Sequence, residues 1–171
     1  MTEEMVHMGA MGLLTSVVAP GIVMAGRRFV PWRRVPAQPV LVLPLFLALH
    51  AAITIAMGVA EFAVPADLAL HGLLLVAAMW FWLPVLQPRP GAPDAARTVY
   101  LFLAGPSLDL AAVYLIIRGN EPGGLAMIVG MLPLGIAAVA VTWRWMARED
   151  RLARQRETGL SLAGGRPEAG K

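Results

Sequence analysis

Residues 39–61 read PVLVLPLFLALHAAITIAMGVAE, an apolar segment in which Glu61 is the first charged residue. An α-helix rises about 1.5 Å per residue, so this segment is long enough to cross the roughly 30 Å hydrocarbon core of a bilayer. Four further segments of similar length are almost free of charge: residues 5–25, 68–87, 98–117 and 124–146. Short polar connections separate the segments. The pattern predicts an all-α, polytopic membrane protein with five transmembrane helices within residues 1–147.

The overall composition favours the same fold class. Of the 171 residues, 58% are hydrophobic and 15% are charged, and the mean hydropathy is +0.67. An average soluble domain is about 45–50% apolar and about 25% charged, and a chain of this size has one modest core in which to bury apolar surface. The sequence contains no cysteine, which excludes disulfides, thiolate metal sites and cysteine nucleophiles. Any metal ligands must therefore come from His, Met, Asp or Glu.

The positive charges are divided unevenly between the two sides of the predicted bundle. Thirteen of the 14 Lys and Arg residues fall in the first and third connections and in the C-terminal tail, whereas Arg118 lies on the other side. The positive-inside rule then places the N-terminus outside and the C-terminus in the cytoplasm. The alternative of four spans and a buried half-helix puts several arginines on the wrong side. The acidic start, Met1-Thr2-Glu3-Glu4, differs from a basic signal peptide and favours an uncleaved first span.

Residues 148–171 form a second region of different composition. Arginines recur at helical spacing at positions 148, 151, 154 and 156, and the glycine-rich segment 164–167 follows. We expect a short basic helical extension near anionic headgroups, followed by a disordered cytoplasmic tail. The alternative interpretation is that these arginines serve only topology and solubility.

Proline and glycine recur within the predicted spans. Each span contains one proline in its interior, at positions 20, 44, 84, 106 and 133. A proline frees a backbone carbonyl that neighbouring groups must satisfy in lipid, so we expect kinked helices that pack together. Glycines in the spans allow backbones to approach closely; they are Gly9, Gly12, Gly21, Gly58, Gly72, Gly105, Gly130 and Gly135. Both residue types are also ordinary in membrane helices.

Histidine and methionine gather toward the outer ends of the predicted helices. His7 and His71 each lie in the first turn of a span, at ends that share a side of the membrane in the predicted topology. His7 and Met11 are four residues apart, which places them on one helical face, and Met127 and Met131 have the same spacing. Thioether and imidazole ligands suit copper. The pattern predicts a copper site with ligands His7, Met11, His71 and Met127.

Four further residues form a second set of candidate ligands: Met8, Met131, His50 and Asp109. Methionine is also a common apolar filler of helix cores, so burial without ligation remains open for every thioether. His50 and Asp109 lie within the second and fourth spans, where ionisable side chains are costly in lipid. They could meet as an ion pair or hydrogen bond that makes both tolerable, or they could carry protons or a metal.

Several short motifs in this order resemble a known family. They are His7-Met8, Ala19-Pro20, His71 followed by Phe81-Trp82-Leu83-Pro84-Val85, and Gly123-Gly124-Leu125-Ala126-Met127. Over residues 5–147 the sequence resembles the CtaG family of cytochrome c oxidase assembly factors. The resemblance implies an assembly role rather than catalysis, in a bacterial plasma membrane, with haem-copper oxidase subunits or another copper chaperone as partners. The match is divergent: Met11 stands where a further His is expected, the family's Trp-His pair is missing, and Ile128 replaces a Trp.

Other functions find less support in the sequence. There is no P-loop, dinucleotide fingerprint or HExxH motif, and the serines lack a triad constellation, so we do not expect an enzyme. We expect no nucleic-acid partner, because the basic residues follow the membrane topology and no aromatic side chains alternate with them. Two other hypotheses remain open. One is a small transporter or proton-conducting protein that uses His50 and Asp109, and the other is a structural subunit of a membrane complex, packed through its glycine faces.

Overall fold

The computed structural model describes residues 2–87 and 94–164. The first membrane-length helix covers Glu3–Arg28. Four consecutive elements form this part of the chain: α1 (Thr2–Leu13), the π-helical turn η1 (Leu14–Val18), α2 (Ala19–Ala25) and the 3-10 turn η2 (Gly26–Arg28). After a second 3-10 turn, η3 (Trp32–Arg34), four helices follow: α3 (Pro39–Val59), α4 (Val64–Leu86), α5 (Asp94–Ile117) and α6 (Glu121–Gly164). Within the described ranges, five helices are long and apolar enough to cross a membrane, which confirms the predicted all-helical, five-helix architecture.

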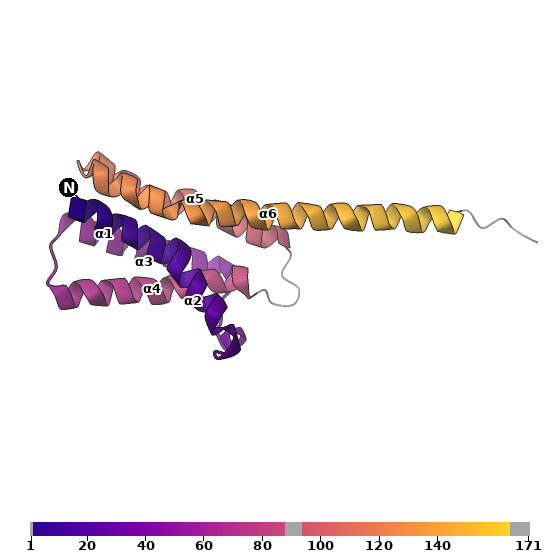
Figure 1. The fold of residues 1–171 in the computed structure, drawn as a ribbon, viewed down its shortest axis with the longest axis horizontal. Coiled ribbons are helices and arrows are strands. Elements are labelled where there is room, and N and C mark those ends of the chain that lie inside the picture. The colour runs from indigo at the N-terminus through magenta and orange to yellow at the C-terminus, as the bar shows by residue number, and fades with distance from the viewer. Residues whose placement is uncertain (1, 88–93, 165–171) are drawn as a thin grey trace, which may run out of the picture.

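The C-terminal helix is longer than the sequence analysis anticipated. The last span and the basic extension that we expected after it form one continuous helix, Glu121–Gly164. Figure 1 shows this helix running well beyond the ends of the other four. The tail that we expected to be disordered falls partly on residues 165–171, which lie outside the described residues.

The helices surround one core in a ring. α1 packs against α6, α6 against α5, α5 against α3, and α3 against α4, while α2 closes the ring against α4. Figure 1 shows the same arrangement, with α1 running beside α6 and α2 crossing α4. The two halves of the first span therefore contact different neighbours. Large apolar side chains remain exposed on the outside of the ring, including Val6, Val40 and Val129, as expected of surfaces that contact lipid.

Glycine determines how closely α1 approaches α6. A Cβ atom on Gly12 would lie 2.8 Å from the carbonyl oxygen of Met127 and 3.0 Å from the Cα of Gly130. A Cβ on Gly130 would lie 2.7 Å from the carbonyl oxygen of Gly9. The hydroxyl of Ser16 also donates a 2.6 Å hydrogen bond to the carbonyl of Gly130. This small-residue crossing brings the backbones into contact. By contrast, a Cβ added to Gly21, Gly72 or Gly135 would meet no described atom within 4 Å, so these glycines do not serve helix packing.

Pro20 has a specific consequence in the first span. In the π-helical turn the N–H of Ala19 donates to the carbonyl of Leu14, five residues back. The next bond in this register would run from residue 20 to the carbonyl of Thr15, but proline has no N–H. The indole Nε1 of Trp82 on α4 donates a 2.8 Å hydrogen bond to that carbonyl instead. A neighbouring helix thus satisfies the carbonyl that proline frees, as the membrane interior requires.

The turn between α5 and α6 shows why the last two helices pair. Gly119 has φ of 93°, in the left-handed region that favours glycine. Asn120 then caps α6, because its Oδ1 accepts a 3.0 Å hydrogen bond from the N–H of Gly123. A Cβ on Gly124 would lie 2.6 Å from the carbonyl oxygen of Ala112, so α5 and α6 lie in backbone contact immediately after the turn.

An aromatic stack joins three helices in the core. The ring of Phe81 stacks on Phe46 at 4.6 Å and on Tyr100 at 5.2 Å between centroids. The hydroxyl of Tyr100 donates a 2.8 Å hydrogen bond to the carbonyl of Phe81. This stack ties α3, α4 and α5 together, and with the α1–α6 crossing it fixes the relative rotation of the helices that carry the polar residues described next.

Candidate metal centre

Three polar side chains come together near the beginnings of α1 and α4. His7 lies in the second turn of α1, whereas Asp67 and His71 lie in the first two turns of α4. Pro65 near the first position of α4 suits the start of a helix, and the carboxylate of Asp67 complements the positive end of the helix dipole. Asp67 and His71 share one face because they are four residues apart. The start of α4 therefore presents a carboxylate and an imidazole side by side.

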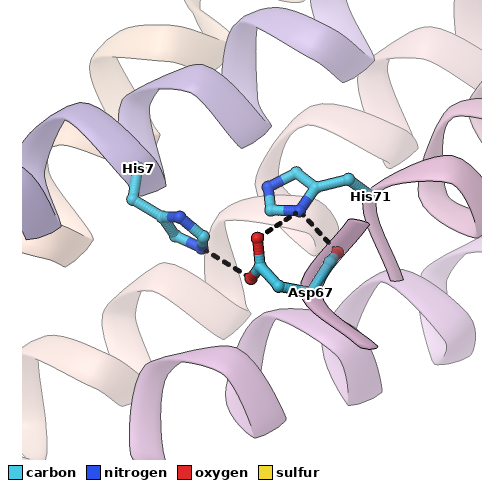
Figure 2. Close-up of polar contacts among 3 residues, drawn as sticks. All are labelled: His7, Asp67 and His71. Atoms are coloured by element: carbon cyan, nitrogen blue, oxygen red, sulfur yellow. Dashed lines mark hydrogen bonds and ion pairs between the residues drawn. The ribbon is translucent and has the colours of Figure 1, made fainter. Parts of the chain in front are cut away.

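The carboxylate of Asp67 lies between the two imidazoles, as Figure 2 shows. Its Oδ1 lies 3.9 Å from Nε2 of His7, and its Oδ2 lies 3.4 Å from Nδ1 of His71. The two rings meet edge to face, with centroids 4.9 Å apart and an interplanar angle of 86°. The side chains of His7 and Asp67 are each 33% exposed, and that of His71 is 21% exposed, so the described residues do not enclose the cluster.

The backbone orients His71. Its Nδ1 lies 2.9 Å from the carbonyl oxygen of Asp67, and because a carbonyl only accepts, Nδ1 must carry the proton in this hydrogen bond. The Nε2 lone pair of His71 is then available for a metal. Metal-binding histidines commonly donate their other N–H to a carbonyl or carboxylate, which fixes the tautomer and the ring orientation.

The donor set suits a divalent transition metal. One ligand atom from each of His7, Asp67 and His71 can be chosen so that all three lie within 4.8 Å of one another. Around a tetrahedral Zn²⁺ with bonds of about 2.0–2.1 Å, ligand atoms are roughly 3.4 Å apart. Two imidazoles and one carboxylate also leave a fourth position open, as in zinc sites that exchange a ligand.

The predicted ligands divide into two groups in the structure. His7 and His71 meet, as their shared level in the predicted topology suggests. Met11 and Met127 are fully buried, at 0% and 1% exposure, and belong to the apolar core. Among the second set, Met8 and Met131 are buried in the same core. The cluster at the ends of α1 and α4 therefore has nitrogen and oxygen donors, while the thioethers contribute to core packing.

His50 and Asp109 do not form the pair that the sequence suggested. His50 is completely buried on α3, and neither of its ring nitrogens has a hydrogen-bond partner among the described residues. Asp109 on α5 is half-buried, and its Oδ1 is also without a partner there. A hydrogen bond between them is therefore not made. The two groups are thus unpaired although α3 and α5 pack together.

Asp67 is the functional candidate that the sequence analysis missed. It directly precedes the third predicted span, in the short connection that follows residues 39–61. The signal was present in its spacing, because Asp67 precedes His71 by four residues at the same helix end. Its position opposite His7 could not be read from spacing, since it depends on how α1 and α4 are arranged.

No protein-family model, curated protein or solved structure matches the chain. The geometry of the His7, Asp67 and His71 cluster therefore carries the functional interpretation.

Proposed function

We propose that this is a multi-pass membrane protein that binds a transition-metal ion through His7, Asp67 and His71 and assists the maturation of a copper-containing oxidase. The observation that carries the metal site is the convergence of two imidazoles from separate helices on one carboxylate, with all three accessible. Polar groups with a purely structural role inside a bundle are normally fully buried, whereas about a fifth to a third of each of these three side chains is exposed. A site of this kind can take up an ion and release it.

The types of ligand atom in the cluster indicate which oxidation state of the metal ion it favours. Cu(I) prefers soft thioether and thiolate ligands, whereas imidazole and carboxylate suit Cu²⁺ and Zn²⁺. Because Met11 and Met127 pack in the core, we propose that His7, Asp67 and His71 bind a divalent ion.

The proposed location is the outer face of a bacterial plasma membrane. The cluster lies near the beginnings of α1 and α4, at the opposite end of α4 from the arginine-rich connections. The positive-inside rule assigns those connections to the cytoplasm. The resemblance of residues 5–147 to the CtaG family supports the same side and an oxidase-assembly role.

Metal titration tests the binding site directly. The purified protein is titrated calorimetrically with Zn²⁺ and with Cu²⁺, and its metal content is measured after dialysis. We expect one ion per chain, and at least roughly tenfold weaker binding in His7→Ala and in His71→Ala. His50→Gln is the matched control, because it removes an imidazole that lies outside the cluster. Equal metal content in all variants, or none in the wild type, would contradict the site.

The assembly role requires a separate measurement. Cells that lack the gene are compared with cells that carry the wild type or the His7→Ala/His71→Ala variant. We expect reduced copper content and activity of the terminal oxidase in the deletion and in the variant. Normal oxidase in both strains would exclude the assembly role while leaving metal binding untouched.

One observation favours a second candidate function. His50 and Asp109 are ionisable groups inside the bundle with unpartnered polar atoms among the described residues, which is typical of proteins that conduct protons or transport polar solutes. This alternative predicts pH-driven flux in proteoliposomes that Asp109→Asn abolishes while metal content is unchanged. A purely structural subunit, the remaining alternative, predicts co-purification with a larger complex that is indifferent to loss of either His7 or His71.

A further inference from the structure

A pocket lies at the end of the bundle opposite the metal centre. It has a volume of about 640 Å³ and is formed where α4 ends and α5 begins, beside the middle of α6. Its lining contains five arginines: Arg27, Arg97, Arg144, Arg148 and Arg151. Among the described residues of this lining, Asp94 is the single carboxylate, which gives a formal charge of +4. Such an excess of positive charge in a concave site selects anions.

Helical spacing places three arginines of α6 on the same face of the helix. Arg144, Arg148 and Arg151 follow the i, i+4, i+7 pattern and share one helical face. The acidic neighbours Glu149 and Asp150 fall on other faces of the helix and do not line the pocket. The local sequence is thus mixed in charge, whereas the face that lines the pocket is basic.

Two hydrogen bonds and an ion pair hold three of the guanidinium groups in place. Oδ2 of Asp94 accepts a 2.7 Å hydrogen bond from Nη1 of Arg148, and Oδ1 lies 3.2 Å from Nη1 of Arg97. Nη2 of Arg27 donates a 2.6 Å hydrogen bond to the carbonyl of Leu86, the last residue of α4. A guanidinium has five N–H donors, so each of these groups keeps donors for a ligand. The forked donors of a guanidinium match phosphate and carboxylate anions.

The rest of the lining is apolar. Val85, Leu86 and Val141 form one part of the wall, and the indoles of Trp143 and Trp145 another. These residues lie at the ends of the apolar segments of α4 and α6, where aromatic side chains mark the membrane interface. A small soluble phosphate compound would leave this apolar wall uncovered. A phospholipid carries glycerol and acyl groups beside its phosphate, and these groups can contact the wall.

We propose that this pocket binds the phosphate of an anionic phospholipid headgroup. Basic pockets between membrane helices on the cytoplasmic side are known to take anionic headgroups. The bound lipid ties the end of α4 and the start of α5 to the basic face of α6. The proposal is independent of the metal centre at the other end of the bundle.

Native mass spectrometry of the purified full-length protein tests the proposal. The protein is mixed with equal amounts of phosphatidylglycerol and phosphatidylcholine, and the retained lipids are counted. We expect one preferentially retained phosphatidylglycerol in the wild type and roughly tenfold or more weaker retention in Arg144→Gln/Arg151→Gln. The matched control Arg118→Gln/Arg156→Gln removes the same number of charges outside the pocket and is expected to retain the lipid. If the double variant does not fold, the single variant Arg151→Gln replaces it in the experiment. We expect its retention of phosphatidylglycerol to be about fivefold weaker than that of the wild type.

A second arm distinguishes the lipid from a soluble phosphate. Inorganic phosphate is titrated into delipidated protein and into protein loaded with phosphatidylglycerol. Weak or absent binding of inorganic phosphate, without displacement of the lipid, is expected. Displacement of the lipid by millimolar phosphate would assign the pocket to a soluble ligand and overturn the proposal. Equal retention of phosphatidylglycerol in the pocket variant and the matched control would overturn it as well.

Discussion

The imidazoles of His7 and His71 meet edge to face, with ring centroids 4.9 Å apart, although they belong to the first and third membrane-length helices. Two imidazoles at this distance repel each other when both are protonated. The carboxylate of Asp67 between them compensates positive charge, whether it is carried by protons or by a metal ion. We therefore expect the cluster to favour a bound cation, and its behaviour toward metals and protons can be predicted.

Removal of the carboxylate is predicted to weaken metal binding without abolishing it. Asp67→Asn keeps the shape of the side chain but loses its charge, so the affinity for Zn²⁺ is expected to fall roughly 10–100-fold. Calorimetric titration measures the change. Asp94→Asn removes a carboxylate at the opposite end of the bundle and should leave the affinity unchanged. An unaltered affinity in Asp67→Asn would exclude this carboxylate as a ligand.

Metal binding is also predicted to release protons. Imidazole must be neutral to bind a metal, so protons compete with Zn²⁺ and the affinity falls as the solution is acidified. Titration in buffers of different ionisation enthalpy counts the protons released. We expect the His7→Ala protein to release fewer protons per bound ion than the wild type. The same proton count in both proteins would show that His7 is not a ligand.

Gly130→Ala is predicted to destabilise the bundle through the α1–α6 crossing. The added methyl group would lie 2.7 Å from the carbonyl oxygen of Gly9, and neither backbone can yield easily. Overpacking of this kind costs about 1–3 kcal/mol of unfolding free energy. Thermal unfolding in detergent measures the effect, with Gly135→Ala as the control because that position is open. Equal melting temperatures of the two variants would refute the close crossing.

Trp82→Phe is predicted to destabilise the protein because the carbonyl of Thr15 loses its hydrogen-bond donor. An unsatisfied buried acceptor costs about 1–3 kcal/mol, and Pro20 cannot supply a replacement. Trp143→Phe changes a side chain that is 72% exposed and should be nearly neutral. Unfolding of both variants under identical conditions compares them. Similar stabilities would mean that water or another group satisfies the Thr15 carbonyl.

His50→Leu is predicted to leave stability unchanged or to raise it by about 1 kcal/mol. Both nitrogens of this fully buried imidazole lack hydrogen-bond partners within the described part of the chain, and leucine fills a similar volume. The unfolding temperature of the variant tests this. A marked loss of stability would indicate that His50 holds water or an ion in the bundle, and would strengthen the transport alternative.

The length of α6 and the α1–α6 crossing are two features that the sequence pattern did not determine. The apolar run 124–146 identified the span, but the polar residues that follow continued the helix to Gly164, because arginine and glutamate are good helix formers and no proline occurs between Pro133 and Pro167. Gly12 and Gly130 were recognised as packing candidates together with Gly21 and Gly72. Which of the four are used depends on which faces of the helices turn inward.

The sequence by itself determined the five membrane-length helices, because a charge-free run of about 20 residues has no other stable arrangement in lipid. It also placed His7 and His71 near matching ends of their helices, because position along a span follows from distance to its polar ends. Only the tertiary structure decided that Asp67 joins them and that His50 and Asp109 make no hydrogen bond to each other. The rotation of each helix about its own axis is set by side-chain packing between helices, and that information is spread over residues distant in the chain.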